Sequence, residues 1–326
     1  MSEPRSIFVD ERWKGAHGIG RYASEVISRL PAGWRSLNAE GKASSPKDAL
    51  RRIPAEARGN VIYSPSYNAS IFRSATQLIT IHDLIHLEVS GPKRVAYQAY
   101  YAGVLRPAVR RARMVLTVSE TSKELITEWV NDDRVEVINA GNAVSDAFQP
   151  DGPSHRAPRP YVLYVGNLRE HKNVDVLLRA LTTSELDAVL VLPAREAVEA
   201  RSKIDAMNLH DRVQVISGVD DPALAEYYRG AAVTAMPSTI EGFGLPALES
   251  LSSGTPVVYW SGCASVAEIV GQDGVAVGSA HDGAEWSRAL EAAGRLTLDR
   301  SNTTDRPRWD DVAARVASAL DVVRAR

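Results

Sequence analysis

The chain has 326 residues, of which 44% are hydrophobic and 24% charged, which excludes general disorder, a collagen-like repeat and a disulfide scaffold. Its net charge of -2 disfavours a nucleic-acid binder, since such proteins carry a stronger basic excess. The single cysteine, Cys263, and a start at residues 1–5 that does not look like a secretory leader predict a cytoplasmic location.

Short apolar segments alternate with amphipathic ones through the first half of the chain. Apolar runs of this length, with helical spacing between them, are typical of parallel strands covered by helices. Ile19, Tyr22, Val26 and Ile27 have the spacing of a helix after the first run. Strands are expected at residues 6–9, 61–63, 78–81, 114–118 and 135–138.

A glycine-rich loop, residues 14–22, follows the first expected strand and opens the helix. Gly18 and Gly20 would let a phosphate or an acceptor approach the backbone closely. The glycines at 15, 18 and 20 do not match the dinucleotide fingerprint, which argues against a dehydrogenase.

Two polar residues stand at expected strand ends. His82 follows the strand at 78–81, where it would either be a hydrogen-bonded core residue or reach a bound substrate. Ser119 follows the strand at 114–118 and suits the N-cap of the next helix.

Residues 92–113 combine lysine and arginine with Tyr97, Tyr100 and Tyr101 and contain no acid. Such a helix would either rest on an anionic membrane surface or pack its aromatic side on the sheet and leave its arginines in solvent.

Residues 149–160 contain four prolines in twelve positions and cannot continue a helix or an inner strand. We interpret this segment as an interdomain linker. The predicted organisation is an N-terminal domain over 1–152, a C-terminal domain over 153–305 and a terminal helix over 306–326 whose amphipathic part is 309–325.

The second half repeats the alternation. A helix is expected over 174–181, and strands are expected at residues 161–165, 188–192, 213–216, 232–236, 256–259 and 275–277. Two doubly wound domains in series predict an α/β protein that binds its ligand in the cleft between the carboxyl ends of its strands.

The loop at residues 166–173 lies between an expected strand and helix. Asn173 suits the N-cap, which would place Lys172 at the start of the helix as an anion site, with Arg169 as a second phosphate contact. The alternative is a solvated, charged turn.

The most specific motif is residues 241–249, EGFGLPALE. Glu241 would lie in the loop after a strand, and Pro246 would begin a helix that places Glu249 near its first turn, facing the same cleft. Carboxylates suit pairs of sugar hydroxyls, and N–H groups exposed by Gly242 and Gly244 suit phosphate. The alternative is that Glu249 complements the helix dipole and the glycines only form a turn.

No Cys or His spacing typical of a metal site occurs, so we expect no metal and no cofactor besides the substrate.

Taken together, EGFGLPALE, GNLREHKN, His82-Asp83, the segment TVSE and the loop GIGRY resemble the retaining GT-B glycosyltransferases of family 4, over nearly the whole chain. The resemblance implies two Rossmann-like domains facing each other across a cleft. The nucleotide-sugar donor would be held mainly by the second domain and the acceptor by the first. The family commonly has a basic residue where this chain has Asn167.

By position, the resemblance implies that Glu249 binds the ribose and Glu241 the hydroxyls of the donor sugar. Lys172 and Arg169 would neutralise the diphosphate, and His82 would lie at the reacting sugar. Gly18 and Gly20 would lie near the phosphates or the acceptor. The remaining donor-binding residues would be Gly242, Phe243, Gly244 and Leu245.

We therefore expect a retaining, metal-independent transferase that moves a hexose or deoxyhexose from a GDP-, UDP- or dTDP-sugar to a glycan, glycolipid or small acceptor. It would be cytoplasmic, with a peripheral contact to the inner face of the cell membrane through residues 92–113. Two alternatives remain open: a nucleotide-sugar epimerase or hydrolase on the same scaffold, and a non-catalytic nucleotide-sugar binder.

Overall fold

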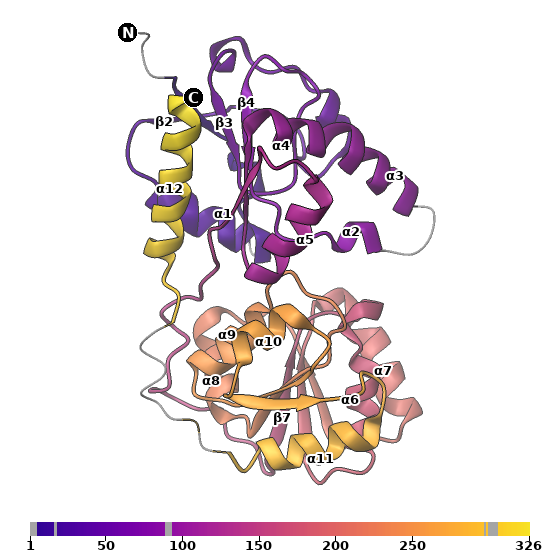
Figure 1. Cartoon of the computed structure of the whole chain (residues 1–326). Coiled ribbons are helices and arrows are strands. Elements are labelled where there is room, and N and C mark those ends of the chain that lie inside the picture. Colours follow the sequence, from indigo (N-terminus) through magenta and orange to yellow (C-terminus); the bar gives the residue numbers. More distant parts are fainter. Residues whose placement is uncertain (1–4, 16–17, 89–92, 297, 299–305) are drawn as a thin grey trace. The chain divides into compact units, whose positions relative to one another are not determined.

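The structure is a computed structural model that describes residues 5–15, 18–88, 93–296, 298 and 306–326 (Figure 1). The chain divides into two compact units, one formed by Met1–Ala143 with Pro307–Arg326 and the other by Val144–Arg306. We describe each unit by itself.

The first unit is built on parallel strands. Its four-stranded sheet has the order β2-β1-β3-β4, and β5 pairs with β6 beside it. A parallel bridge between Thr80 and Leu116 joins the two sets. The strands are β1 (Ile7–Val9), β2 (Trp34–Ser36), β3 (Val61–Ser64), β4 (Thr76–Ile79), β5 (Met114–Thr117) and β6 (Glu136–Asn139).

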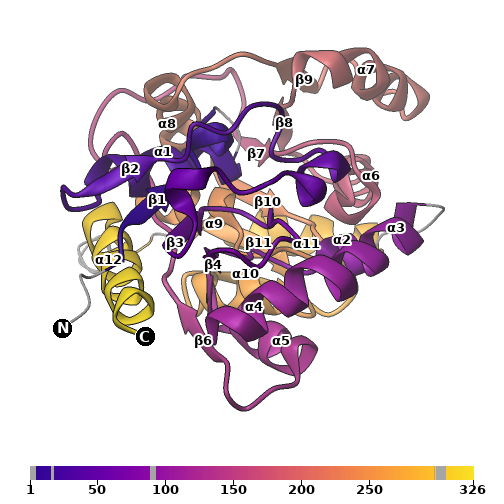
Figure 2. The same ribbon diagram turned by 90° about the horizontal axis from the view of Figure 1, so that it is seen from above.

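Most helices of this unit connect its strands. The last helix of the unit comes from the C-terminal end of the chain, after the second unit. This helix, α12, lies beside α1 (Figure 2). It buries Trp309, Val312, Val316 and Leu320, as its amphipathic pattern predicts. The helices are α1 (Gly18–Arg29), α2 (Ile85–Glu88), α3 (Lys93–Tyr100), α4 (Arg106–Ala112), α5 (Glu120–Val130) and α12 (Trp309–Ala325). The 3-10 turns are η1 (Glu11–Trp13), η2 (Pro46–Leu50) and η3 (Ala55–Ala57), and a π-helical turn is η4 (Tyr101–Leu105).

The second unit contains a six-stranded parallel sheet with the order β12-β11-β10-β7-β8-β9. The strand order reverses between β7 and β10, and in doubly wound sheets such a point carries the ligand site. The strands are β7 (Tyr161–Val165), β8 (Asp187–Val191), β9 (Val213–Ile216), β10 (Val233–Met236), β11 (Val257–Trp260) and β12 (Gly274–Val277).

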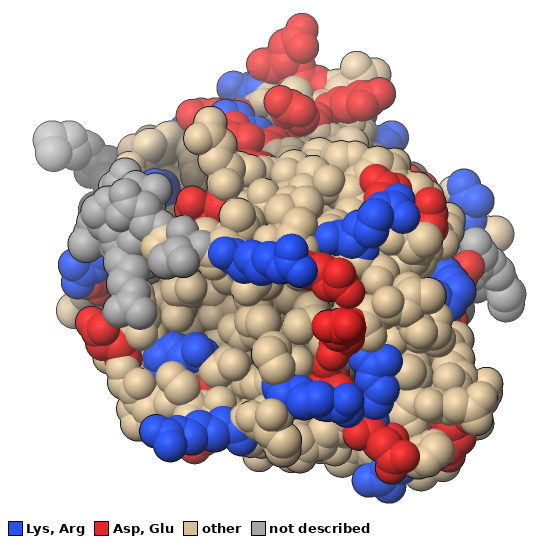
Figure 3. Space-filling view, turned by 90° about the horizontal axis from the view of Figure 1, so that it is seen from below, with Lys and Arg blue, Asp and Glu red and all other residues tan. Residues whose placement is uncertain are grey.

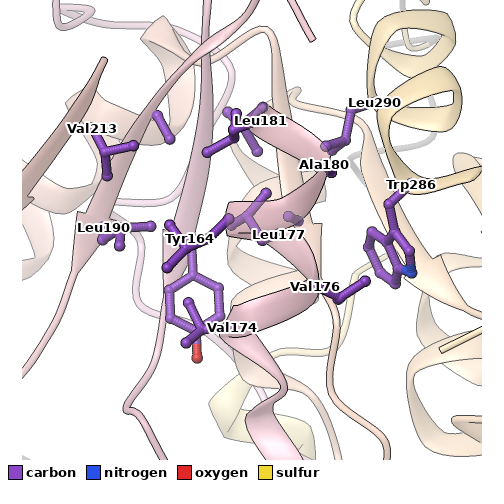
Figure 4. Packing of buried hydrophobic residues seen from close by; sticks show 14 of the residues in the cluster. Tyr164, Val174, Val176, Leu177, Ala180, Leu181, Leu190, Val213, Trp286 and Leu290 are labelled. Carbon is purple, nitrogen blue, oxygen red and sulfur yellow. The ribbon is translucent and has the colours of Figure 1, made fainter. Parts of the chain in front are cut away.

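Both faces of this sheet are buried under helices. Val162 and Tyr164 of β7 join the core formed with α6 and α11, which includes Trp286 (Figure 4). Leu163 of the same strand joins the core on the opposite face with α8. The helices are α6 (Val174–Leu181), α7 (Ala197–Ala206), α8 (Asp221–Gly230), α9 (Leu245–Ser252), α10 (Ala264–Val270) and α11 (Gly283–Ala293), with 3-10 turns η5 (Glu170–Lys172) and η6 (Ala194–Glu196).

These parallel sheets confirm the predicted α/β class with two Rossmann-like domains. The expected strands at 161–165 and 213–216 have the predicted bounds. Strand β2 was not predicted, because its three residues, Trp34-Arg35-Ser36, form no apolar run.

The proline-rich segment 149–160 lies within the second unit, which begins at Val144. Its backbone is hydrogen-bonded to α8 of the same unit. The His155 N–H donates to the Glu226 carbonyl (2.9 Å), and Arg229 Nε donates to the Pro153 carbonyl (2.7 Å). Prolines exclude regular structure from this segment, but its backbone N–H and carbonyl groups still form hydrogen bonds with residues of α8.

Candidate active site

Two loops of the second unit meet at the point where its strand order reverses. The loop after β7 runs through Gly166 to Asn173, and the loop after β10 runs through Glu241 to Gly244. The Thr239 N–H donates to the His171 carbonyl (2.7 Å), which joins the loops directly. Both predicted motifs therefore lie at the edge of the second sheet that is formed by the carboxyl ends of its strands.

Lys172 and Glu241 form an ion pair between these loops. Lys172 Nζ lies 2.5 Å from Glu241 Oε1, and the two side chains are only 15% and 11% exposed. The Ser265 hydroxyl donates to the backbone carbonyl of Glu241 (2.8 Å) and helps to fix its loop. The structure thus brings together a mostly buried lysine and a mostly buried glutamate, whose ammonium and carboxylate are strong hydrogen-bonding groups for a polar ligand.

Asn173 occupies the N-cap position of α6, as the sequence predicts, but it does not cap the helix with its side chain. Its backbone is left-handed (φ 50°), and its side chain makes no capping bond to α6. The side-chain amide instead donates to the carbonyls of Pro237 (3.3 Å) and Ala280 (2.7 Å). Asn tolerates this conformation, and here its side chain ties the loop after β7 to the loop after β10.

Two residues that the sequence analysis missed hold the loop after β7. The Tyr164 hydroxyl donates to the Asn167 carbonyl (2.7 Å), and Glu196 Oε2 accepts from the Leu168 N–H (2.7 Å). Burial, with smaller contributions from Glu241 and Glu196, raises the pKa of the Tyr164 hydroxyl, so it remains a donor. The only sequence signal for Tyr164 was its place near the end of a strand.

The other groups of this loop differ in exposure. Arg169 is exposed, and its backbone N–H donates to the Asn167 side chain (3.1 Å). Burial, followed by the charge of Lys172, lowers the pKa of the His171 imidazole, which is therefore neutral near pH 7. Lys172 consequently carries the mostly buried positive charge of the loop.

Helix α9 begins at the second loop, and no side chain caps its first turn. Gly244 precedes it with a left-handed backbone (φ 104°), and a Cβ there would lie 3.1 Å from Val266 Cγ2. Only glycine meets both conditions without strain. Leu245 and Pro246 form the first turn, as predicted for Pro246, while Gly242 is buried and Phe243 half-buried. Pro246 has no N–H, and the Ala247 N–H donates to the Gly244 carbonyl (2.9 Å), so the Leu245 N–H is the donor that this first turn offers to an anion.

Glu249 lies further along α9 and is 5% exposed. The hydroxyl of Tyr228, on α8, donates to Glu249 Oε2 (2.9 Å), and the Tyr228 carbonyl accepts from the Thr255 hydroxyl (2.5 Å). A carboxylate this deeply buried requires hydrogen-bond donors. Tyr228 is therefore a structural partner of Glu249 that sequence reasoning did not identify.

Replacing Tyr228 by phenylalanine should lower the free energy of unfolding by about 1–3 kcal/mol, because a buried carboxylate loses a donor. Chemical denaturation measures this loss. Tyr227→Phe is the matched control, since the adjacent Tyr227 is only half-buried and its ring contacts the His155 ring in a tilted arrangement, with the centroids 4.3 Å apart. Equal stabilities of the two variants would contradict the importance of the Glu249 contact.

The remaining predicted site residues belong to the first unit. His82 is 8% exposed, and its Nε2 donates to the Pro65 carbonyl (2.9 Å). The ring of Tyr22 meets the His82 ring edge-on at 4.8 Å. His82 is therefore a hydrogen-bonded, buried residue, and its role toward a substrate stays a prediction.

Gly18 and Gly20 lie at the start of α1, and residues 16–17 of the same loop are outside the described residues. Gly18 is exposed, whereas a Cβ on Gly20 would lie 2.5 Å from the Gly15 carbonyl oxygen. Gly20 therefore allows loop and helix to pack closely. Ser119 caps α5 as predicted, accepting from the Ser122 N–H (3.0 Å).

Part of the basic segment 92–113 is engaged within the first unit, and Pro92 lies outside the described residues. Arg110 Nη2 donates to the Val130 carbonyl (2.7 Å), and the Arg106 guanidinium lies 5.1 Å from the centre of the Trp129 ring. These two arginines pack against α5, so they contribute less to a lipid-facing surface than the sequence suggests. The membrane contact stays a prediction.

On the face shown in Figure 3, basic and acidic side chains lie next to each other among neutral residues. The electrostatic field of this face is therefore not dominated by one sign of charge. Among the described residues, no three His, Cys, Asp or Glu side chains form a group that could hold a metal ion. No helix within the described ranges is both long and apolar enough to cross a membrane.

Comparison with known sequences gives a consistent result. Residues 147–308 match the family described as glycosyl transferases group 1. Over an alignment of 230 positions the chain is 33% identical to a D-inositol 3-phosphate glycosyltransferase of Streptosporangium roseum, and this alignment covers 64% of this chain and 50% of the relative. It is 28% identical to an O-antigen chain mannosyltransferase of Salmonella typhimurium over 213 residues, 64% of this chain and 58% of the relative. The chain thus aligns with about half the length of the curated relatives it matches.

Comparison with solved structures concerns the fold. A sucrose-phosphate synthase from Thermosynechococcus elongatus superposes with a TM-score of 0.68 at 19% identity, covering 96% of this chain and 98% of the other. An Anabaena protein solved in complex with UDP and glucose gives a TM-score of 0.70 at 15% identity, covering 98% and 99%. These likenesses, with the parallel sheets, confirm the predicted GT-B fold of two Rossmann-like domains.

Proposed function

Because residues 147–308 form a glycosyl transferases group 1 domain, we propose that the chain is a retaining glycosyltransferase acting on a nucleoside-diphosphate sugar without a metal ion. It transfers a hexose or deoxyhexose to a hydroxyl of a glycan, glycolipid or small acceptor. The observation that carries the proposal is the Lys172–Glu241 pair at the reversal point of the second sheet, beside the uncapped start of α9.

In this proposal each group binds one part of the nucleotide-sugar donor. The Lys172 ammonium and the Leu245 N–H at the start of α9 bind the diphosphate, which is the leaving group. The Glu241 carboxylate accepts hydrogen bonds from sugar hydroxyls, and Glu249 serves the ribose. Arg169 is exposed and adds a diphosphate contact from the rim.

The reaction breaks the bond between the anomeric carbon and the diphosphate oxygen and forms a bond from that carbon to the acceptor oxygen. Positive charge grows on the sugar ring while negative charge grows on the diphosphate. Donors held in place before the reaction stabilise that negative charge without reorganisation. The acceptor attacks from the leaving-group side, and its proton passes to the departing diphosphate. His82, in the first unit, is assigned in this proposal to the reacting sugar.

Calorimetry with GDP-, UDP-, dTDP- and ADP-sugars, followed by product analysis with a hydroxyl acceptor, tests the proposal. We expect one nucleotide to bind and the sugar to be transferred with retained anomeric configuration in the presence of EDTA. Sugar release without an acceptor would favour a hydrolase or epimerase, and binding without turnover would favour a non-catalytic protein. Loss of activity in EDTA would exclude the metal-independent mechanism.

The hydrogen bond from the Tyr164 hydroxyl to the Asn167 carbonyl, which holds the loop after β7, provides a separate prediction. Tyr164→Phe should weaken binding of the nucleotide sugar about three- to tenfold, or about 0.6–1.4 kcal/mol, because the loop that presents Lys172 loses a hydrogen bond. Tyr161→Phe is the matched control, because its hydroxyl makes an equal bond, 2.7 Å to the Tyr227 carbonyl, from the other end of the same strand. Equal affinities in the two variants would contradict the anchoring role of Tyr164.

A further inference from the structure

The positive and negative groups of the candidate site are bound to each other in this structure. Lys172 Nζ and Glu241 Oε1 lie 2.5 Å apart, and neither side chain is more than 15% exposed. Glu196, another acid beside the loop, already accepts from the Leu168 N–H and from Arg195 Nη2 (3.2 Å). The ammonium of Lys172 is therefore neutralised by Glu241 in particular.

A diphosphate that binds Lys172 must compete with this carboxylate. When the nucleotide carries a sugar, the hydroxyls of the sugar replace the ammonium as hydrogen-bond donors to Glu241. When the nucleotide carries no sugar, Glu241 keeps its charge, loses its partner and lies near a second anion in a partly desolvated place.

We propose that Glu241 is a specificity-determining residue that lowers the affinity of the site for the sugar-free nucleoside diphosphate. The nucleotide sugar binds because its sugar hydroxyls donate hydrogen bonds to the Glu241 carboxylate. After transfer the sugar has gone, so Glu241 recovers Lys172 and promotes release of the diphosphate. This inference rests on the proposed function and assigns to Glu241 a second role, discrimination of substrate from product.

Calorimetry with GDP, UDP and dTDP on the Glu241→Gln variant tests the inference. Glutamine keeps the shape of the side chain and removes its charge. For the diphosphate that wild type binds, we expect about tenfold tighter binding by Glu241→Gln, a size common for couplings between charged groups. The affinity for the matching nucleotide sugar should not rise, because the contact with the sugar hydroxyls is weakened.

Two further variants separate competition for Lys172 from a general charge effect. Glu170→Gln removes one acid from an exposed position two residues before Lys172 and should change the diphosphate affinity less than about twofold. In a Lys172→Ala background, Glu241→Gln should lose most of its gain, because no ammonium remains to be released. A gain of equal size in that background, or in Glu170→Gln, would overturn the proposed competition.

The outcomes distinguish this inference from the proposed function. Unchanged or weaker diphosphate binding by Glu241→Gln, in a protein that still binds and transfers the sugar in its wild-type form, would refute the inference alone. A wild-type protein that binds none of the diphosphates or nucleotide sugars would refute both. Thermal melting of each variant verifies that the second unit is folded.

Discussion

Lys172→Ala is expected to lower turnover by about 10²–10³, which corresponds to about 3–4 kcal/mol of barrier, because one preorganised positive contact to the leaving diphosphate is lost. The ammonium is only 15% exposed, so water replaces it poorly. Steady-state kinetics with saturating nucleotide sugar and acceptor measures the effect on kcat. A fall in kcat together with kcat/KM would indicate that the contact strengthens in the transition state.

The matched control removes a lysine from an ion pair elsewhere in the same unit. Lys203 Nζ lies 2.9 Å from Asp175 Oδ1, with the two side chains 31% and 47% exposed. Lys203→Ala should leave kcat within about twofold of wild type, because surface pairs contribute little. If Lys172→Ala retained near-wild-type turnover with a folded second unit, Lys172 could not be the group that stabilises the diphosphate.

Most of the strands, and the sheet edge at which the two motifs lie, could be predicted because buried parallel strands leave apolar runs in the sequence. The loops that carry Lys172 and Glu241 follow two such runs, β7 and β10. Since the carboxyl ends of parallel strands share one edge, the sequence placed both motifs at that edge. What it could not show is that β7 and β10 are neighbours, or that the two side chains are paired.

The missed features depend on partners distant in sequence. The Leu168 N–H is bound by Glu196, 28 residues away, and Glu249 is bound by Tyr228, 21 residues away. Asn173 matches the local pattern of an N-cap, yet its side-chain amide donates to the carbonyl of Ala280, 107 residues further along the chain. Tertiary hydrogen bonds of this kind leave no periodic or local signal in the sequence. At Asn173 such a bond takes the side chain away from the capping role that its local sequence favours.

Glu241→Ala is expected to lower turnover by about 10²–10³ as well, because the donor sugar loses the carboxylate that orients its hydroxyls. The loss should appear with the full donor in steady-state kinetics at saturating acceptor. Glu170→Ala is the control for removal of an acid from the neighbouring loop, and it should retain wild-type turnover within about twofold. Equal activities of the two variants would contradict the assignment of Glu241.

The double variant Lys172→Ala/Glu241→Ala separates structural from catalytic effects. Each single change leaves one charged group without its partner, and we expect each to lower the free energy of unfolding by about 1–3 kcal/mol, less than for a fully buried pair. Removing both charges should restore much of that stability, whereas activity should remain at or below that of the weaker single variant. Stability and turnover would then change in opposite directions. If turnover recovered along with stability, the pair would serve the fold rather than the reaction.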